Sequence, residues 1–339
     1  MHRDRMKLPI IIVSVLLAVT IAFGVFLWLD SVSVSDVDSG AKAKEMSAVY
    51  FDGVAYRRKN IVTYLLIGID EFGEVHDSGS YNNTMQADFL ALIVVNKTDR
   101  TYSIFQINRD TMAKIDRLGI GGMKAGTVYE QIALSHTYGD GLEMSAKNTV
   151  RAVSRLLGRG KDYTGNAKDF EIDYYVTMNM DAVSKTNDYL GGVTLTLGDD
   201  EDLSGINEKW IPGATITLSG SDALKFVRAR MSVQDGTNIS RMNRQRHYID
   251  ELIKQQQQQG KTYSYSFASE LYSEIKEYIV TNCSLVDFDD LMGYVSAYEY
   301  TGTLTPAGES KDGEEFMEFY VDEAKLDEMV REYFYEKRD

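Results

Sequence analysis

The fold of this chain is predicted first from residues 89–107, FLALIVVNKTDRTYSIFQI. Two runs of apolar and β-branched residues, 89–95 and 101–107, flank the polar segment 96–100. Runs of this length that are bounded by turn-forming residues are typical of β-strands. We therefore predict that residues 89–107 form an antiparallel hairpin.

A third strand is predicted upstream, where the apolar run IVTYLLI at residues 61–67 ends at Gly68. Downstream of the hairpin, stretches with helical and strand periodicity alternate, which indicates a layered α/β domain. Further strands are expected at residues 172–178, 193–197 and 316–320, and helices at 146–157, 181–190, 221–225, 239–259, 267–280, 288–298 and 323–335.

Charged residues flank the three predicted strands at one end. These residues are Asp70, Asp88, Arg109 and Asp110. If the first and third strands run parallel, all four side chains reach the same edge of the sheet, where sites in open α/β sheets gather. The alternative is that they are ordinary polar residues of turns and strand ends.

A second motif, FVRARMSVQDGTNISRMNRQRH at residues 226–247, is rich in arginine although the chain has a formal net charge of −15. It holds five arginines, no lysine and one aspartate. The arginines are Arg228, Arg230, Arg241, Arg244 and Arg246. The planar guanidinium group binds phosphate through two parallel hydrogen bonds, which an ammonium group does not.

Spacing places these arginines in pairs. Arg228 and Arg230 share a face of an extended segment, and Arg241 and Arg244 share a face of a helix. Ser240 is the expected N-cap of that helix, whose free N–H groups would add to anion binding. We interpret the motif as a phosphate clamp; the alternative is a solvated basic helix face with surface ion pairs.

Composition bounds the class of protein. A chain of 339 residues with 44% hydrophobic residues can form one domain of over 200 residues with small appendages. The acidic net charge argues against general binding to nucleic acid. Cys283 is the single cysteine, which excludes an internal disulfide and a cysteine metal cage. The four histidines have no spacing typical of metal ligands.

The N-terminus predicts the compartment. Residues 8–29, LPIIIVSVLLAVTIAFGVFLWL, carry no charge and can span a hydrocarbon core of ~30 Å. The basic residues before them should remain in the cytoplasm, so the rest lies outside. We predict a cytoplasmic tail at 1–7, a transmembrane anchor at 8–29, a tether at 30–59 and an extracellular domain at 60–339. A cleaved signal peptide is the alternative, but the apolar run is long and no small-x-small cleavage site follows.

Several segments, taken in chain order, resemble the LytR-CpsA-Psr family, membrane-anchored enzymes that move glycopolymers from a lipid carrier to the bacterial cell wall. They are LLIGID (65–70), QADFLALIVVN (86–96), INRDT (107–111), IDYYVTMN (172–179), LGGVTLTL (190–197), LSGSDALKFVRAR (218–230) and SRMNRQR (240–246). Each segment is a weak signal alone. Together, in this order and behind one predicted anchor helix, they are a specific signature of this family.

The resemblance implies a three-layer α/β/α sandwich with a mixed central sheet, preceded by one transmembrane helix. It also implies a polyprenyl-pyrophosphate-linked glycan, such as a teichoic acid or capsular polysaccharide precursor, with its tail in an apolar pocket. Mg²⁺ would bridge the phosphates and acidic residues. A sugar hydroxyl of peptidoglycan would then attack and leave the polymer attached through a phosphodiester. The implied partners are peptidoglycan and the cytoplasmic membrane.

The resemblance also implies roles for individual residues. Asp70 and Asp88 match metal-binding aspartates, and Mg²⁺ prefers such oxygen ligands. Positions that match pyrophosphate contacts are Arg109, Arg228, Arg230, Arg241 and Gln245, and Arg244 is a further candidate. Catalysis is assigned to Arg109, Asp88 and Asp110, and Asp110 either orients Arg109 or acts as a base.

The chain departs from the family pattern at Phe72 and Gln86, where arginine is usual, at Asn108, where proline is usual, and at Asn238, where aspartate is usual. Losing a charge-assisted hydrogen bond typically costs ~1.5–3 kcal/mol. Three hypotheses therefore stay open: a Mg²⁺-dependent phosphotransferase, a catalytically impaired lipid-pyrophosphate or polymer-binding assembly or regulatory factor, and a lipid pyrophosphatase that uses water.

Overall fold

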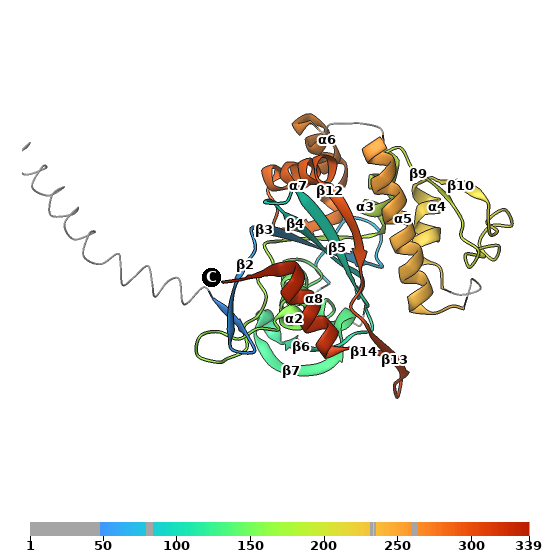
Figure 1. The fold of residues 1–339 in the computed structure, drawn as a ribbon. Coiled ribbons are helices and arrows are strands. Elements are labelled where there is room, and N and C mark those ends of the chain that lie inside the picture. The colour runs from blue at the N-terminus through green and yellow to red at the C-terminus, as the bar shows by residue number, and fades with distance from the viewer. Residues whose placement is uncertain (1–47, 79–83, 231–232, 234, 259–263, 339) are drawn as a thin grey trace, which may run out of the picture.

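A computed structural model describes residues 48–78, 84–230, 233, 235–258 and 264–338. The predicted anchor at 8–29 lies outside these residues. Within them, no helix has the length and apolar character needed to cross a membrane. A six-stranded sheet forms the centre, and helices cover both of its faces (Figure 1). The predicted α/β fold with a mixed central sheet is confirmed.

The strands of the central sheet follow the order β11-β8-β3-β4-β5-β12. Their bounds are Ile279–Thr281 (β11), Tyr174–Met178 (β8), Ile61–Ile69 (β3), Ala87–Asn96 (β4), Thr101–Ile107 (β5) and Glu299–Leu304 (β12). β4 is antiparallel to both β3 and β5, while β8 is parallel to β3 and β12 is parallel to β5. The hairpin predicted at residues 89–107 is therefore correct, and β3 and β5 run in the same direction.

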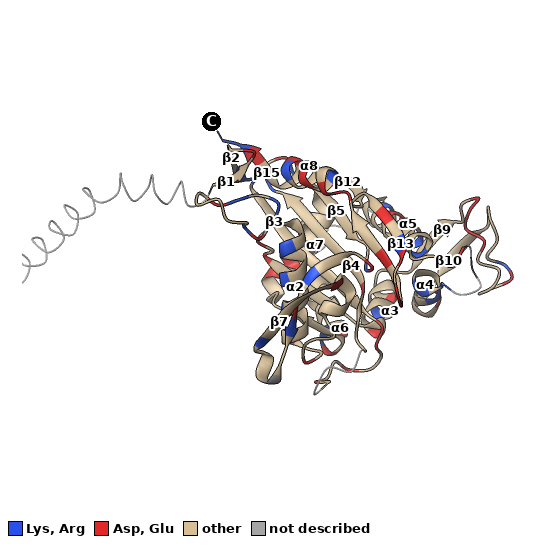
Figure 2. Ribbon diagram, turned by 90° about the horizontal axis from the view of Figure 1, so that it is seen from below, with Lys and Arg blue, Asp and Glu red and all other residues tan. Residues whose placement is uncertain are grey.

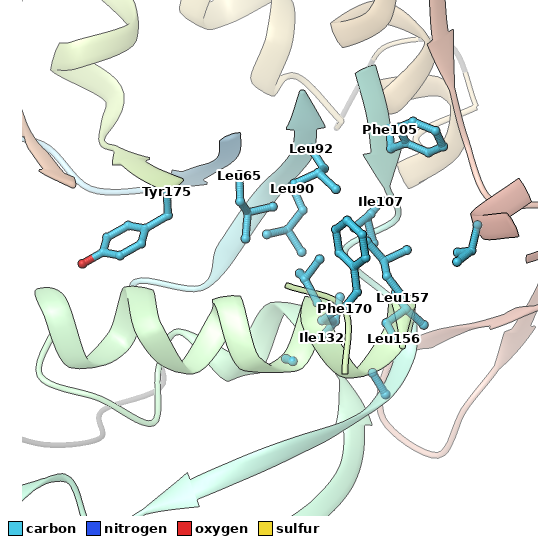
Figure 3. Packing of buried hydrophobic residues seen from close by; sticks show 14 of the residues in the cluster. Leu65, Leu90, Leu92, Phe105, Ile107, Ile132, Leu156, Leu157, Phe170 and Tyr175 are labelled. Atoms are coloured by element: carbon cyan, nitrogen blue, oxygen red, sulfur yellow. The ribbon is translucent and has the colours of Figure 1, made fainter. Parts of the chain in front are cut away.

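Alternate residues of β4 are buried on opposite faces of the sheet. Leu90 and Leu92 belong to one hydrophobic core, and Ala91 and Ile93 to the other. Figure 3 shows Leu65, Leu90 and Leu92 beside the helix that carries Leu156 and Leu157. The first face is covered by α2 (Glu143–Leu157) and α8 (Glu323–Phe334), and the second by α3 (Met180–Tyr189), α5 (Asn238–Gln258), α6 (Tyr265–Ile275) and α7 (Leu285–Ala297).

A small lobe projects from the sheet beside α5, on the right of Figure 1. It consists of β9 (Val193–Thr196), β10 (Thr215–Leu218) and α4 (Gly220–Arg228). Trp210, Phe226 and Tyr248 are buried in its own hydrophobic core. Because Phe226 anchors the last turn of α4 in this core, the C-terminal end of that helix has a fixed position against α5.

The remaining elements form three small sheets and three 3₁₀ turns. The sheets are β1 (Val49–Phe51), β2 (Val54–Arg58) and β15 (Tyr335–Lys337); β6 (Met112–Leu118) and β7 (Lys124–Gln131); and β13 (Gly308–Asp312) and β14 (Met317–Val321). The 3₁₀ turns are η1 (Ile120–Gly122), η2 (Ile132–Ser135) and η3 (Lys276–Tyr278).

Two expectations about the elements were wrong, and one hairpin was missed. The folded domain begins before residue 60, because Val49 and Phe51 of β1 are buried in the main core, so the predicted tether is too long. The helix expected at 267–280 ends at Ile275, because Ile279 pairs with Met178 at the edge of the sheet. The hairpin of β6 and β7 was not predicted at all.

Phe334 allows a direct test of the core. Its side chain is fully buried and its ring stacks on Phe170, with the ring centroids 4.5 Å apart. We expect Phe334→Ala to lower the free energy of unfolding by about 3–5 kcal/mol, measured by urea denaturation, because it leaves a cavity. Phe316→Ala, at a side chain that is 63% exposed, should change it by no more than about 0.5 kcal/mol. Equal effects of the two substitutions would contradict this packing.

Asp116 of β6 ties the β6–β7 hairpin to α2. Both of its oxygens accept hydrogen bonds from Arg155 at 2.8 Å, and Lys124 lies 2.9 Å from Oδ1. Burial alone would raise the pKa of Asp116, but the hydrogen bonds from Arg155, Lys124 and Thr127 outweigh it and hold the pKa well below its ordinary value.

A depressed pKa makes Asp116 a source of acid sensitivity. Its contribution to stability is complete above its unfolded-state pKa of ~3.9 and is lost as the pH falls from there toward the folded-state pKa. We expect Asp116→Asn to lower the free energy of unfolding at neutral pH and to make its fall below pH ~4 shallower. Urea denaturation across this pH range would measure both effects, and an unchanged acid slope would show that Asp116 is not responsible.

Candidate functional site

The strands β3, β4 and β5 bring four charged residues to one edge of the sheet. Asp70 follows β3, Asp88 is the second residue of β4, and Arg109 and Asp110 follow β5. Arg109 forms ion pairs with Asp88 and, at 3.4 Å, with Asp110. The negative charge of Asp70 also acts on the pKa of Arg109. The predicted meeting of these residues is therefore confirmed.

The arginine motif reaches the same edge from α4 and α5, on both of which Figure 2 shows basic positions. Arg228, the last residue of α4, donates a hydrogen bond of 2.5 Å to Asp70 Oδ1. Arg241, in the first turn of α5, donates to the main-chain carbonyl of Asp88 at 3.4 Å. Two distant parts of the chain thus place guanidinium groups directly beside both aspartates.

The geometry of the motif differs from the prediction in two respects. Arg228 lies within helix α4, so it does not share an extended segment with Arg230. Helix α5 begins at Asn238, so Ser240 lies inside the helix and is not its N-cap. The capping residue is Thr237, whose Oγ1 accepts a hydrogen bond of 3.2 Å from the main-chain N–H of Ser240.

The cations of this edge are crowded and poorly solvated. Burial lowers the pKa of Arg241 to about 9, and repulsion from Arg109 and Arg230 contributes to the shift. Burial also lowers the pKa of Arg109, although Asp110 partly offsets the effect. Within the described part of the chain, the buried Nε of Arg241 has no hydrogen-bond partner. A desolvated guanidinium group beside like charges gains strongly from a nearby anion, so the site favours an anionic ligand.

Asp110 is buried and held from two sides. Burial raises its pKa, and Arg109 and Arg230 act in the opposite direction without reversing the shift. Gln131, the last residue of β7, donates to Asp110 Oδ1 at 3.2 Å and to the carbonyl of Met317 at 2.6 Å. These contacts suit a residue that orients Arg109. Gln131 was missed because no strand was predicted there, although the pairing of β6 with β7 would have placed it beside Asp110.

Two predicted phosphate contacts from α5 have structural partners. Arg244 is fully buried and donates to the carbonyls of Phe226 (3.2 Å) and Ala229, and Gln245 donates to the carbonyl of Val227 (3.2 Å). These bonds hold the last turn of α4, which carries Arg228. The predicted contacts of Arg244 and Gln245 with pyrophosphate both stay predictions.

The substitutions at Gln86 and Phe72 contact the arginines that remain. Gln86 Oε1 accepts a hydrogen bond of 2.5 Å from Arg109. The guanidinium carbon of Arg228 lies 5.4 Å from the centre of the Phe72 ring, a cation–π contact. The family resemblance leads one to expect arginine at both positions. Here Gln86 instead contacts Arg109, and Phe72 contacts Arg228.

The substitutions at Asn108 and Asn238 contact each other. Asn238 Nδ2 donates to Asn108 Oδ1 at 2.8 Å, and Asn238 Oδ1 accepts from Arg241 at 2.7 Å. Asn108 Oδ1 also accepts from the main-chain N–H of Asp110 at 2.9 Å. The two departures from the family pattern are therefore parts of one hydrogen-bonded network inside the site.

Asp70 and Asp88 are the residues that could hold a metal ion. They lie where β3 and β4 pair, next to the matched residues Ile69 and Ala87. The described residues contain no group of three or more His, Cys, Asp or Glu side chains that could enclose a metal. Mg²⁺ often binds one or two carboxylates and completes its shell with phosphate and water oxygens. The pair therefore fits a metal that binds together with a phosphate ligand.

Two cavities bear on the apolar pocket that the resemblance implies. A cavity of about 10 Å³ borders Ile69 and Phe72 at the site and has room for roughly one water molecule. A cavity of about 460 Å³ is lined by none of the arginines of the site; its lining includes Phe51, Arg159 and Arg331. Neither of these two cavities is an apolar pocket for a polyprenyl tail beside the arginines.

Proteins of known sequence and structure resemble this chain. It is 28% identical over 272 residues, 79% of this chain and 75% of the relative, to the polyisoprenyl-teichoic acid–peptidoglycan teichoic acid transferase TagU of Bacillus licheniformis. It is 31% identical over 179 residues, half of this chain and 32% of the relative, to the cell wall biosynthesis protein LcpA of Corynebacterium glutamicum.

Solved structures share the fold. TagV of B. subtilis covers 81% of this chain with 97% of its own, at a TM-score of 0.59 and 19% identity. TagT bound to LI-WTA covers 81% with 90% of its own, at a TM-score of 0.55 and 21% identity. The model of the LytR_cpsA_psr family matches residues 26–333, which include every strand and helix of the site. This chain, with its mixed sheet and arginine-lined edge, belongs to the LytR_cpsA_psr family.

Proposed function

We propose that the protein transfers a glycopolymer from a polyprenyl-pyrophosphate carrier to peptidoglycan, as a Mg²⁺-dependent phosphotransferase anchored in the cell membrane. The convergence of Arg109, Arg228 and Arg241 on the edge that carries Asp70 and Asp88 is the observation that supports it most. The names of the relatives support the class of substrate, and the uncharged stretch at residues 8–29 supports the anchor.

The chemistry asks for positioning and charge stabilisation more than for a covalent nucleophile. The acceptor hydroxyl oxygen attacks the phosphorus that carries the sugar. A new oxygen–phosphorus bond forms as the bridge between the two phosphates breaks, and polyprenyl monophosphate leaves. Arg109, Arg228, Arg230 and Arg241 hold the phosphate oxygens and offset their charge in the transition state. A bound Mg²⁺ would offset further charge on the same oxygens.

The hydroxyl proton must pass to a base of the site. Asp110 is our candidate, because burial raises its pKa and a carboxylate with a raised pKa is a stronger base. Asp110 would act as this base while its contact with Arg109 orients the guanidinium group.

Exchange of ion-pair partners would couple the two ligands. Asp70 and Asp88 pair with Arg228 and Arg109. A diphosphate that binds these arginines would release both carboxylates, and Asp70 and Asp88 could then hold Mg²⁺. Each ligand would thus break ion pairs that compete with binding of the other. We therefore expect positive cooperativity between pyrophosphate and Mg²⁺.

A transfer assay tests the function. The protein is incubated with a short synthetic polyprenyl-pyrophosphate disaccharide and a peptidoglycan fragment, and the products are identified by mass spectrometry. We expect a phosphodiester-linked conjugate together with polyprenyl monophosphate, in amounts that depend on Mg²⁺. Free disaccharide phosphate would instead indicate that water is the acceptor, and tight binding without any product would indicate a non-enzymatic role.

A further inference from the structure

Asn238 is a buried amide whose two ends have different partners. It is 6% exposed, and its Oδ1 accepts from Arg241 at 2.7 Å while its Nδ2 donates to Asn108 at 2.8 Å. Asn108 is 2% exposed and offers an acceptor oxygen, which an aspartate at position 238 could not bond. The network therefore requires the neutral amide in this orientation.

The contacts of Arg241 leave its charge uncompensated by a direct partner. Its hydrogen bonds go to the amide of Asn238 and, at 3.4 Å, to the main-chain carbonyl of Asp88. Both acceptors are neutral, and the buried Nε has no partner among the described residues. Repulsion from Arg109 and Arg230 destabilises the positive charge of Arg241, and the carboxylate of Asp110 partly offsets this repulsion. A buried arginine held in this way is oriented without being neutralised.

We propose that Asn238 is a positioning residue that aims Arg241 at the diphosphate while leaving its charge free, and that it thereby sets the affinity of the site for diphosphate. The inference rests on the proposed function and adds a determinant of affinity to it. An aspartate here would place a negative charge against Arg241 and oppose the ligand. The site should therefore bind diphosphate without Mg²⁺ more tightly than the same site with aspartate at 238.

The test compares binding of inorganic pyrophosphate to the full-length protein in detergent, by isothermal titration calorimetry in EDTA at neutral pH. We expect Asn238→Asp to weaken binding about tenfold or more, since a charge-assisted contact is worth ~1.5–3 kcal/mol. With excess Mg²⁺ the deficit should shrink severalfold, because the metal offsets charge on the ligand. A merely structural defect would lower both affinities equally.

Helix α5 supplies a matched control. Asn243 is exposed and accepts a hydrogen bond of 2.9 Å from Arg246, so Asn243→Asp makes the same charge change beside an arginine on the same helix. It should leave pyrophosphate affinity within about twofold of wild type, since exposed charges are screened. Asn238→Ala should weaken binding equally with and without Mg²⁺, because it removes the aim of Arg241 and adds no charge.

Three results would overturn the inference: wild-type affinity in Asn238→Asp, an equal loss in Asn243→Asp, or a deficit that Mg²⁺ does not change. Transfer of the lipid-linked disaccharide is measured on the same samples. Pyrophosphate binding with the expected deficit but no transfer by wild type would refute the proposed function and leave the role of Asn238 standing. No pyrophosphate binding by wild type would refute both.

Discussion

Replacing Arg109 by Gln is expected to lower the rate of transfer about 10³-fold. Arg109 contacts three side chains of the site, since it reaches Asp88, Asp110 and Gln86 from the end of β5. Gln keeps much of the side chain's length and polarity but removes the charge and the fork of donors that a phosphate needs. The measurement is the initial rate of conjugate formation at saturating Mg²⁺ and lipid-linked substrate.

Arg246→Gln provides the control for the loss of a positive charge. Arg246 lies on α5, and its guanidinium group bonds Asn243 at the surface. This variant should retain the wild-type rate within about twofold, because surface charges are screened by salt. A rate loss below tenfold in Arg109→Gln, in a protein whose thermal unfolding is unchanged, would remove Arg109 from the catalytic machinery.

Replacing Asp88 by Asn should lower the transfer rate about 10²-fold and raise the Mg²⁺ concentration needed for half-maximal rate. The substitution should also change pyrophosphate binding, because Asp88 is an ion-pair partner of Arg109. Without that carboxylate, Arg109 loses one anionic partner that competes with phosphate, so pyrophosphate binding in EDTA should become tighter. Calorimetry measures the expected gain in pyrophosphate affinity, and the Mg²⁺ dependence of the rate measures the expected loss of metal affinity.

Opposite changes in the two measurements distinguish partner exchange from a general loss of structure. Asp290→Asn, at an exposed carboxylate on α7, should change neither. If Asp88→Asn weakens pyrophosphate binding in EDTA as well as transfer, the ion pair with Arg109 does not compete with the ligand. The proposed coupling between diphosphate and Mg²⁺ would then be wrong.

The strands β3, β4 and β5 and the charged residues at their edge could be predicted because local patterns determine them. The apolar runs around residues 89–107 are continuous, and both faces of β4 are buried, so the hairpin and its flanking Asp88 and Arg109 follow. The β6–β7 hairpin could not be predicted in this way. Lys124–Gln131 is largely exposed and lacks the apolar run that marks a buried strand.

Contacts between residues far apart in the sequence could not be predicted either. Spacing placed Arg241 and Arg244 on a helix, but it could not show that Arg244 faces the carbonyls of α4 while Arg241 faces the aspartates. Asn108 and Asn238 are 130 positions apart, so each looked like an isolated departure from the family pattern. Only the packing of α5 against the end of β5 reveals that they are partners.

A crystal structure of the protein with a short polyprenyl-pyrophosphate-linked sugar would show directly where the phosphates bind. We predict that oxygens of the two phosphates lie ~2.7–2.9 Å from guanidinium nitrogens of Arg109, Arg228 and Arg241, beside Asp70. Phosphates bound elsewhere, for example in the 460 Å³ cavity lined by Arg159, with those three arginines still facing their carboxylates, would contradict it.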